Sequence, residues 1–264
     1  MDNIVYIATI SGGKDSVTMC DLLLKNGYPV DYIVFNDTLD EFEEMYEYLN
    51  KIEDYFKKRY KKSITRLKPV KSYDEYIFGV RGDRAKSENR GRIVGLPNPT
   101  TGFCEWRRDS KIIPFDKWVK QFARYKTYIG ITMDEQNRAN RDDNTLLYPL
   151  IDEFKMSEQD CMQYLIKQEM ENPLYRHFTR TGCSKCQYQS EKDFFNIWKY
   201  YPKVWQEMKN YELRVKKFGN AISEHWFSNH RTCEDMEKMF IEANKQGSLF
   251  DFSNEPLKDC FCKV

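Results

Sequence analysis

The sequence lacks the long apolar run that a membrane-spanning helix requires, and its opening residues, MDNIVYIAT, carry no basic segment ahead of an apolar one. We therefore expect a cytoplasmic protein with no secretory signal and no membrane partner. An excess of charge of one sign is also missing, because 42 basic and 41 acidic side chains leave a formal net charge of +1. A uniformly basic nucleic-acid-binding surface is not indicated, although this balance neither requires nor excludes binding to DNA or tRNA.

Internal repeats and low-complexity segments are absent as well. The eight cysteines are too few and too scattered for a small disulfide scaffold, and their clustering is better explained by metal binding or redox chemistry. The length of 264 residues suits one large α/β domain, or one domain with a smaller appendage. The sequence says nothing of the oligomeric state.

Short apolar runs alternate with helical patterns over the first 150 residues. Strands are predicted at 4–10, 30–37, 63–70 and 127–132, helices at 15–25 and 39–60, and a strand end or turn at 146–151. This alternation implies right-handed crossovers and a parallel sheet. We predict an α/β fold with a doubly wound, mostly parallel sheet over about residues 1–153.

The strand pattern stops after about residue 153. Residues 157–170 and 191–245 have the spacing of helices, and the aromatic residues of the last third are interpreted as core. We predict one domain over residues 1–190 and a helical C-terminal region over 191–264. The polar segment 81–102 is predicted to be a long loop, and loops of that length inside a compact domain are usually functional or disordered.

The segment SGGKDS follows the first predicted strand and opens the first predicted helix. Two glycines let the main chain approach a ligand closely, the helix start offers free N–H groups, and two hydroxyls and a lysine add donors. The combination predicts binding of phosphate or pyrophosphate by Ser11, Gly12, Gly13, Lys14, Asp15 and Ser16. The alternative is a strand-to-helix turn with no ligand. The spacing matches neither the Walker A motif nor G-x-G-x-x-G.

Several segments, in order along the chain, resemble the PP-loop ATP pyrophosphatases, and more closely their PAPS (phosphoadenosine phosphosulfate) reductase-like branch. SGGKDS is similar to the pyrophosphate-binding loop of that superfamily. The other similar segments, which together span about residues 4–190, are FNDTLDEFEEMYEYL, CEWRRDSKIIP, GITMDEQNR, YPLIDEFKMSEQDCMQYL and NPLYRHFTRTGCSKC. The resemblance implies an adenine nucleotide alpha-hydrolase-like fold, with the nucleotide-binding domain over residues 1–190.

The resemblance also implies an adenine nucleotide site. Lys14, Asp15 and Lys111 are then the catalytic candidates. The nucleotide contacts fall on the SGGKDS loop together with Asp37, Thr38, Gly130 and Arg138. Asp15 is the first candidate to hold Mg²⁺ or to orient the loop, and Asp37 is a candidate for ribose or metal contact. Their alternative roles are helix capping and strand-end turn formation.

Two departures from the sulfonucleotide reductases of this family bear on the reaction. Those enzymes carry an eroded first loop, whereas Lys14 and Asp15 are both present here, which favours true ATP chemistry. They also end in a Glu-Cys-Gly-Leu-His type tail, and this chain ends KDCFCKV. We expect cleavage of ATP to AMP and pyrophosphate, which activates an acceptor for sulfur transfer from a donor protein or thiol.

Two other functions stay open at this point. One is a sulfonucleotide reductase that releases sulfite, with Cys260 or Cys262 as the nucleophile. The other is a non-catalytic nucleotide-binding module of a larger assembly, such as one that acts on DNA.

The cysteines predict a metal centre. Cys183 and Cys186 form a C-x-x-C pair, and the resemblance places another ligand at Cys104. Cys262 or Cys260 is the candidate fourth ligand, unless a sulfur species fills an open site. A [4Fe–4S] cluster is preferred over Zn²⁺, since three or four thiolates satisfy either metal. A dithiol redox pair, or two cysteines without a role, are the alternatives.

The remaining cysteines and histidines have more ordinary interpretations. Cys20 and Cys161 fall on apolar helix positions and are predicted to be core. His225, His230 and Cys233 have spacings that zinc could use, but helical packing or capping explains them better.

Basic residues gather on the 81–102 loop and after Cys104. They form either a solvated surface or an anion-binding cradle at the mouth of the site. They are Arg81, Arg84, Lys86, Arg90, Arg92, Arg107, Arg108 and Lys111.

Overall fold

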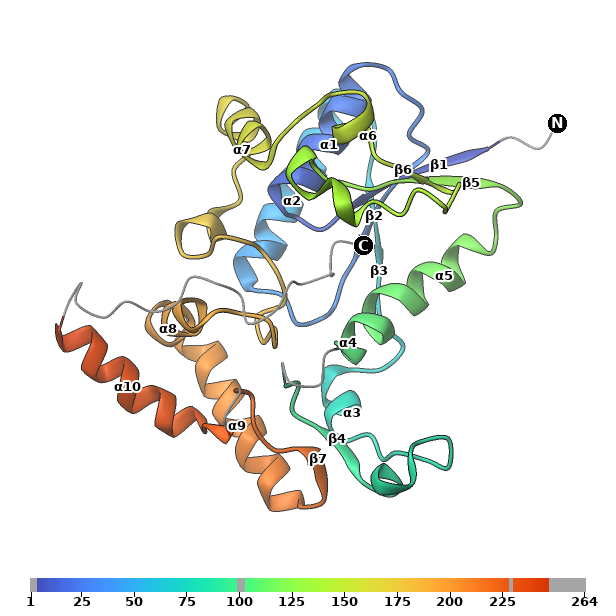
Figure 1. Ribbon diagram of the computed structural model, residues 1–264. Coiled ribbons are helices and arrows are strands. Elements are labelled where there is room, and N and C mark those ends of the chain that lie inside the picture. The colour runs from blue at the N-terminus through green and yellow to red at the C-terminus, as the bar shows by residue number, and fades with distance from the viewer. Residues whose placement is uncertain (1–3, 99–102, 228–229, 247–264) are drawn as a thin grey trace. The chain divides into compact units, whose positions relative to one another are not determined.

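The computed structural model describes residues 4–98, 103–227 and 230–246 (Figure 1). By their internal contacts these residues group into two compact units. The first contains residues 4–70 and 107–183, and the second contains residues 71–98, 103–106, 184–227 and 230–246. The division of the sequence near residue 190 stays a prediction, and each compact unit is described by itself.

The first unit is built on a parallel five-stranded sheet in the order β3-β2-β1-β5-β6. In the register, Ile7 of β1 pairs with Tyr32 of β2 on one side and with Thr127 of β5 on the other. The strands are β1 (Val5–Ile10), β2 (Tyr32–Asn36), β3 (Ile64–Leu67), β5 (Tyr125–Tyr128) and β6 (Leu146–Leu147). The predicted α/β class with a mostly parallel sheet is confirmed.

Helices flank this sheet, and Figure 1 shows α1 and α5 on opposite sides of the strands. Ile7 and Val34 pack against Phe115 and Val119 of α5. Because both faces are covered, the central strands are apolar along most of their length, which made them recognisable in the sequence. The helices are α1 (Lys14–Lys25), α2 (Glu43–Tyr60), α5 (Ile113–Val119), α6 (Pro149–Asp152) and α7 (Glu158–Lys167), with the short turns η3 (Arg108–Ile112), η4 (Met133–Arg138) and η5 (Pro173–Arg176).

The strand order decides where a ligand binds. The chain runs outward from β1 through β2 to β3, and then crosses to β5 on the other side of β1. Ligands of open parallel sheets bind beyond the carboxyl ends of the strands at such a reversal. The segments that follow β1, β2 and β5 all leave the sheet at this edge, and they begin at Ser11, Asp37 and Ile129.

The second unit is mainly helical. Its helices are α3 (Tyr73–Ile77), α8 (Glu191–Tyr200), α9 (Pro202–Phe218) and α10 (Cys233–Gln246), with the turn η1 (Ser87–Asn89); α4 (Glu105–Arg107) lies where the chain passes back to the first unit. Two short parallel strands, β4 (Ile93–Gly95) and β7 (Ala221–Ser223), pair with each other.

These two strands correct the sequence analysis. The region 191–245 was predicted to be helical throughout, and 81–102 to be loop, yet each contains one strand of the pair. Each strand has only three residues, which is too short for an alternating pattern to be seen. Gly219, whose φ is +72°, ends α9 just before β7.

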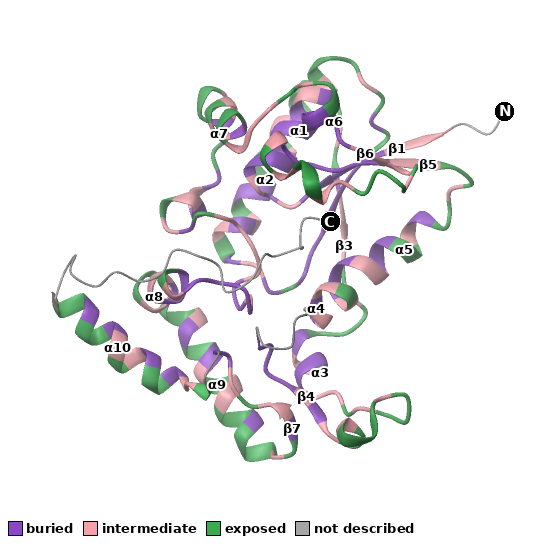
Figure 2. Cartoon of the chain, viewed as in Figure 1, coloured by how far each residue is buried: buried purple, intermediate pink, exposed green. Residues whose placement is uncertain are grey.

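Several aromatic residues of the second unit are core, as predicted for the last third of the chain. Trp205 and Phe240 lie with ring centroids 5.6 Å apart, and Phe194 meets Phe227 edge-on at 4.9 Å. Trp226 is buried and donates its indole N–H to the carbonyl of Met208. Figure 2 shows buried positions alternating with exposed ones along α9 and α10, as expected of helices with one covered face. No helix within the described ranges is both long and apolar enough to cross a membrane.

Candidate functional site

The SGGKDS loop lies directly after β1 in the first unit, and α1 begins at Lys14. Gly12 has φ +76°, and a Cβ there would come within 2.3 Å of the sulfur of Met45. The loop is held by its own hydroxyls, since Ser16 Oγ accepts from the amide of Ser11 at 3.0 Å and donates to the carbonyl of Gly13 at 3.1 Å. The geometry is that of a strand-to-helix turn at the carboxyl end of β1.

Later parts of the chain hold the same loop from outside. Asn172 donates its side-chain amide to the carbonyl of Gly12 at 2.9 Å, and the hydroxyl of Tyr175 accepts from the amide of Lys14 at 2.9 Å. Gly130, two residues beyond β5, packs so closely that a Cβ would lie 2.8 Å from Ser16 Cα. The loop is therefore fixed from the next strand and from the η5 segment.

Lys14 is largely buried, and its Nζ lies 2.5 Å from Glu158 Oε2 and 3.8 Å from Asp15 Oδ1. Burial lowers the pKa of this ammonium, but the charges of Asp15, Tyr175 and Glu158 outweigh burial and raise it well above its ordinary value. Lys14 is thus fully charged at neutral pH, and it occupies the position where an anionic ligand would meet the loop.

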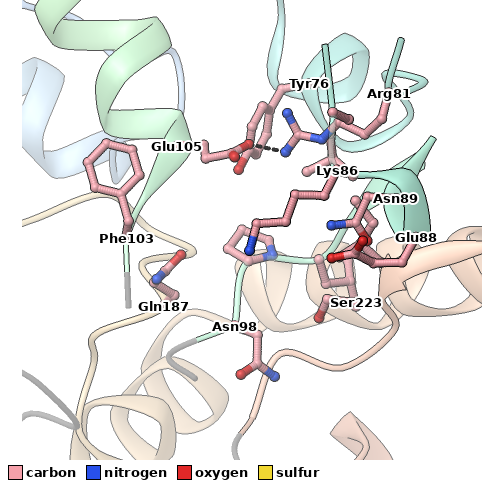
Figure 3. Close-up of a pocket in the computed structure, with 15 residues that line it drawn as sticks. Tyr76, Arg81, Lys86, Glu88, Asn89, Asn98, Phe103, Glu105, Gln187 and Ser223 are labelled. Atoms are coloured by element: carbon pink, nitrogen blue, oxygen red, sulfur yellow. Dashed lines mark hydrogen bonds and ion pairs between the residues drawn. The ribbon is translucent and has the colours of Figure 1, made fainter. Parts of the chain in front are cut away.

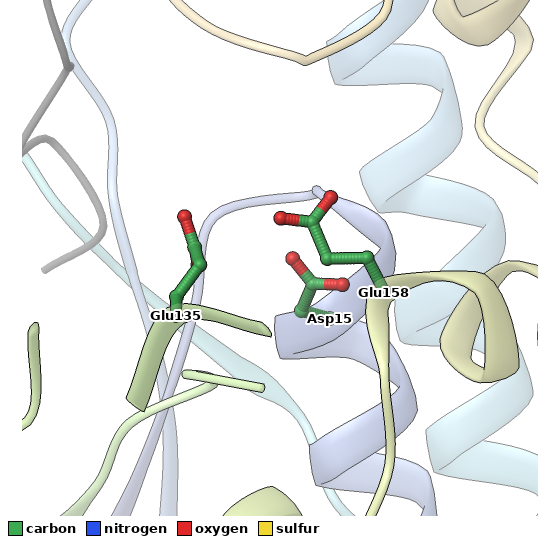
Figure 4. Close-up of side chains that lie close together, drawn as sticks. All are labelled: Asp15, Glu135 and Glu158. Carbon is green, nitrogen blue, oxygen red and sulfur yellow. The ribbon is translucent and has the colours of Figure 1, made fainter. Parts of the chain in front are cut away.

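Three carboxylates converge beside Lys14. Figure 4 shows Asp15, Glu135 and Glu158 turned toward a common space, and one oxygen of each lies within 4.8 Å of the others. Asp15 comes from the first turn of α1, Glu158 from the first turn of α7 and Glu135 from η4. A set of hard oxygen donors fits Mg²⁺ rather than a thiophilic metal.

Arg138 reaches the same group, because it forms an ion pair with Glu135. The structure therefore places Arg138 and Gly130 next to the SGGKDS loop, which contains Asp15. A shared role in one site requires this proximity. Glu135 and Glu158 received no role in the sequence analysis.

Asp37 and Thr38 follow β2, the strand next to β1. Asp37 is buried, and its Oδ1 accepts from the hydroxyl of Tyr46 at 2.8 Å and from the amide of Leu39 at 2.9 Å. Thr38 donates to Glu41 at 2.8 Å. These bonds define the turn after β2, and the ribose or metal contact of Asp37 stays a prediction.

Lys111 lies in the π-helical turn η3 and is buried to nine-tenths. Burial raises the pKa of Glu41, while the charge of Lys111 and the hydroxyl of Thr38 act in the opposite direction. Within the described residues, Glu41 Oε2 is buried and accepts no hydrogen bond. Lys111 thus lies close enough to Glu41 to lower its pKa, and π-helical turns are frequent at functional sites.

Comparison with known proteins identifies the family of the chain. The model of the family described as "Phosphoadenosine phosphosulfate reductase domain" matches residues 5–189. The chain belongs to this family. An uncharacterized protein of Methanocaldococcus jannaschii is 28% identical over 237 residues, which are 83% of this chain and 44% of that protein. The chain thus spans less than half the length of this curated relative.

A solved structure was also found to be similar. It is the PAPS reductase of Candida auris in a phosphate complex, with 17% sequence identity, a TM-score of 0.45, and coverage of 67% of this chain and 80% of that chain. Membership in the phosphoadenosine phosphosulfate reductase domain family rests on the family model, which matches most of the chain.

The cysteines predicted to bind a metal are divided between the units. Cys183 closes the first unit, whereas Cys104 and Cys186 belong to the second. All three are half-buried. Cys260 and Cys262 lie outside the described residues, and the metal centre stays a prediction.

The other cysteines are placed as expected. Cys20 and Cys161 are buried completely, and burial raises the pKa of the Cys20 thiol. Cys233 is buried at the start of α10. In the part of the chain that the structure describes, Cys233, His225 and His230 do not bring three ligand atoms together.

Sequence reasoning gave no role to several groups that hold the loop or face it. These are Glu135, Glu158, Asn172 and Tyr175. All of them lie in segments that carried the family resemblance, which was the signal available. Glu158 comes one residue after the Ser157 N-cap of α7.

Proposed function

We propose that this member of the phosphoadenosine phosphosulfate reductase domain family binds ATP at the SGGKDS loop and cleaves it to AMP and pyrophosphate, activating an acceptor for sulfur transfer. The observation that supports this most is the charged, complete loop. Lys14 is buried against it, and Asp15 faces two further carboxylates. A cluster of oxygen ligands beside the loop is what a magnesium-dependent reaction of ATP would use.

Different residues of the chain have different roles in the proposed reaction. The amides at the start of α1 and the ammonium of Lys14 hold the β- and γ-phosphates, which become the leaving group. Lys111 stabilises the charge that grows on the α-phosphate. Asp15, Glu135 and Glu158 are the residues that would hold Mg²⁺, which supplies charge neutralisation at the phosphate oxygens when bound.

The reaction is balanced as an in-line displacement. An oxygen of the acceptor forms a bond to the α-phosphorus, and the bond from that phosphorus to the bridging oxygen breaks, with the electron pair leaving on pyrophosphate. A sulfur nucleophile from a donor protein or thiol then forms a bond to the activated carbon or phosphorus of the acceptor. AMP leaves with the oxygen. Glu41, whose pKa is raised by burial, is suited to accept the acceptor proton.

Release of pyrophosphate from ATP with Mg²⁺ tests the proposal. We expect AMP and pyrophosphate as products, and a loss of about 100-fold in rate in Lys14→Ala. Lys25→Ala is the matched control, since Lys25 lies at the exposed other end of the same helix.

Other outcomes separate the alternatives. Formation of ADP and phosphate contradicts the proposal. Release of sulfite from an adenylyl sulfate with a thiol reductant identifies a reductase instead. Tight binding of ATP without turnover identifies a non-catalytic module.

A further inference from the structure

The second unit contains a pocket of its own, with a volume of about 440 Å³. Its walls come from α3, the 81–98 segment, Phe103 and Glu105, β7 and Gln187, all of which belong to this unit. The volume exceeds what a single phosphate or sulfate fills, and it lies within the range of small-molecule sites. The SGGKDS loop contributes nothing to it.

One polar group in the wall has no partner. Gln187 is 4% exposed, and its side-chain Nε2 forms no hydrogen bond within the described residues. A buried donor without an acceptor costs on the order of 1–3 kcal/mol, so such a donor usually has an ordered water or a ligand as its partner. Figure 3 shows Gln187 at one side of the pocket, with Asn98 below it.

The charges of the wall are mixed. Lys86 extends into the space between Glu105, Gln187 and Asn89 (Figure 3), and no described carboxylate lies within ion-pair distance of it. Arg81 is paired with Glu105, and Glu88 adds a second carboxylate. Two cations and two carboxylates do not select a simple anion. They suit a ligand that offers donors along one edge and a negative charge at one end.

Flat apolar surface completes the wall. Phe103 is 49% exposed, and Tyr76 and Phe103 line the pocket together with Val94, Leu96 and Pro97. Exposed aromatic rings are the platforms on which bases stack, and amide and carboxylate side chains read the donors and acceptors of base edges. Asn98 is held in place, because its amide nitrogen donates to the carbonyls of His225 and Phe227.

We propose that this pocket binds one nucleotide, with the base between the aromatic and amide groups and the phosphate at Lys86. The site is additional to the SGGKDS loop and does not depend on the ATP reaction proposed above. Its ligand comes either from free nucleoside monophosphates or from an unpaired nucleotide of a single strand, since both present the same chemistry.

Calorimetric titration of the full-length chain tests this, with AMP, GMP, CMP and UMP in one arm and a ten-nucleotide single-stranded DNA or RNA in the other. We expect at least one probe to bind, and to bind about tenfold more weakly in Lys86→Ala and in Gln187→Leu. Binding of monophosphates identifies the free source, and binding of oligonucleotides alone identifies the strand.

Three controls keep the test decisive. Lys217→Ala removes an exposed cation of α9 outside the pocket and leaves binding unchanged. Lys14→Ala reports on the SGGKDS loop, so only nucleotide binding that survives in this variant is assigned to the pocket. Phe103→Ala provides a second weakened variant at a half-exposed position if Gln187→Leu fails to fold.

The proposal is overturned if no probe binds. It is also overturned if Lys86→Ala and Phe103→Ala bind as tightly as the wild type, or if inorganic phosphate alone competes as well as the nucleotide.

Discussion

The ammonium of Lys14 lies 2.5 Å from the carboxylate of Glu158, a residue 144 positions further along the chain. The pair joins the start of α1 to the start of α7, and it places a carboxylate against the ammonium of the SGGKDS loop. Glu158 is 38% exposed, so the pair is partly screened by water and contributes little to stability. A phosphate that reaches Lys14 must compete with this carboxylate.

Glu158→Gln is expected to change nucleotide binding in two opposite ways. Without Mg²⁺ the variant binds ATP about threefold more tightly, because a weak competing ion pair is removed. With Mg²⁺ the variant needs more metal for half-maximal binding, because one of three oxygen ligands has lost its charge. Titrations in EDTA and in magnesium measure both effects.

Glu153→Gln is the matched control, since Glu153 accepts a hydrogen bond from Tyr28 and lies outside the carboxylate group. An identical magnesium requirement in Glu158→Gln and in the wild type would remove Glu158 from the metal site.

Gly130→Ala is expected to distort the SGGKDS loop, because Gly130 follows the neighbouring strand β5 and packs against the loop. The added methyl would meet the backbone of Ser16 at 2.8 Å, where no flexible side chain can give way. We expect a loss of about 1–3 kcal/mol in the free energy of unfolding and a loss of ATP binding.

Denaturant unfolding and calorimetry measure these two losses. Gly82→Ala, where nothing lies within 4 Å of the added methyl, is the control. Normal ATP binding in Gly130→Ala would show that this approach has no part in the site.

Alkaline pH is expected to weaken the contact between α1 and α7. Tyr164 donates to buried Asp21, as does Tyr60, and burial together with the Asp21 carboxylate raises the pKa of both phenols. Above pH 10 the unfolded chain loses these protons while the folded chain keeps them. The unfolded state then binds fewer protons, so the free energy of unfolding falls as pH rises.

Urea unfolding between pH 8 and pH 11 measures this slope. Tyr164→Phe should make the fall in the free energy of unfolding shallower. Tyr32→Phe, which changes the exposed first residue of β2, should leave this slope unchanged. Equal slopes in Tyr164→Phe and the wild type would exclude the Asp21 pair as the cause.

The cysteine prediction is tested by metal analysis of an anaerobic preparation. We expect about four iron and four sulfide per chain, with brown colour, and loss of both in Cys186→Ser and Cys104→Ser. Cys161→Ala is the control, because Cys161 is fully buried in α7. Zinc without sulfide would identify the alternative metal, and a metal-free, colourless protein would leave the thiols as a redox pair.

The sequence predicted the central sheet because β1 and β2 are covered on both faces and are therefore almost continuously apolar. It also predicted the loop, since SGGKDS concentrates glycines, hydroxyls and charge between a strand and a helix. Lys14 and Asp15 could be singled out for the same reason. The strands β4 and β7 were not predicted, because a strand of three residues is too short to show an alternating pattern of apolar and polar residues.

Tertiary contacts explain what the sequence missed at the site. Glu158 is a surface-type residue in the first turn of α7, where a carboxylate is explained equally well by the helix dipole. Asn172 binds the carbonyl of Gly12 across 160 residues, and only the folded chain reveals that contact. The local sequence pattern thus predicted the position of the loop. The groups around the loop come from distant segments, and only the fold brings them to this edge of the sheet.

The central claim is that the SGGKDS loop binds the phosphates of ATP. Isothermal titration of the full-length chain with ATP and Mg²⁺, compared with Lys14→Ala and with Lys25→Ala, tests it most directly. The account predicts binding to the wild type and to Lys25→Ala that is lost in Lys14→Ala. Equal binding to all three proteins, or binding to none, would contradict it.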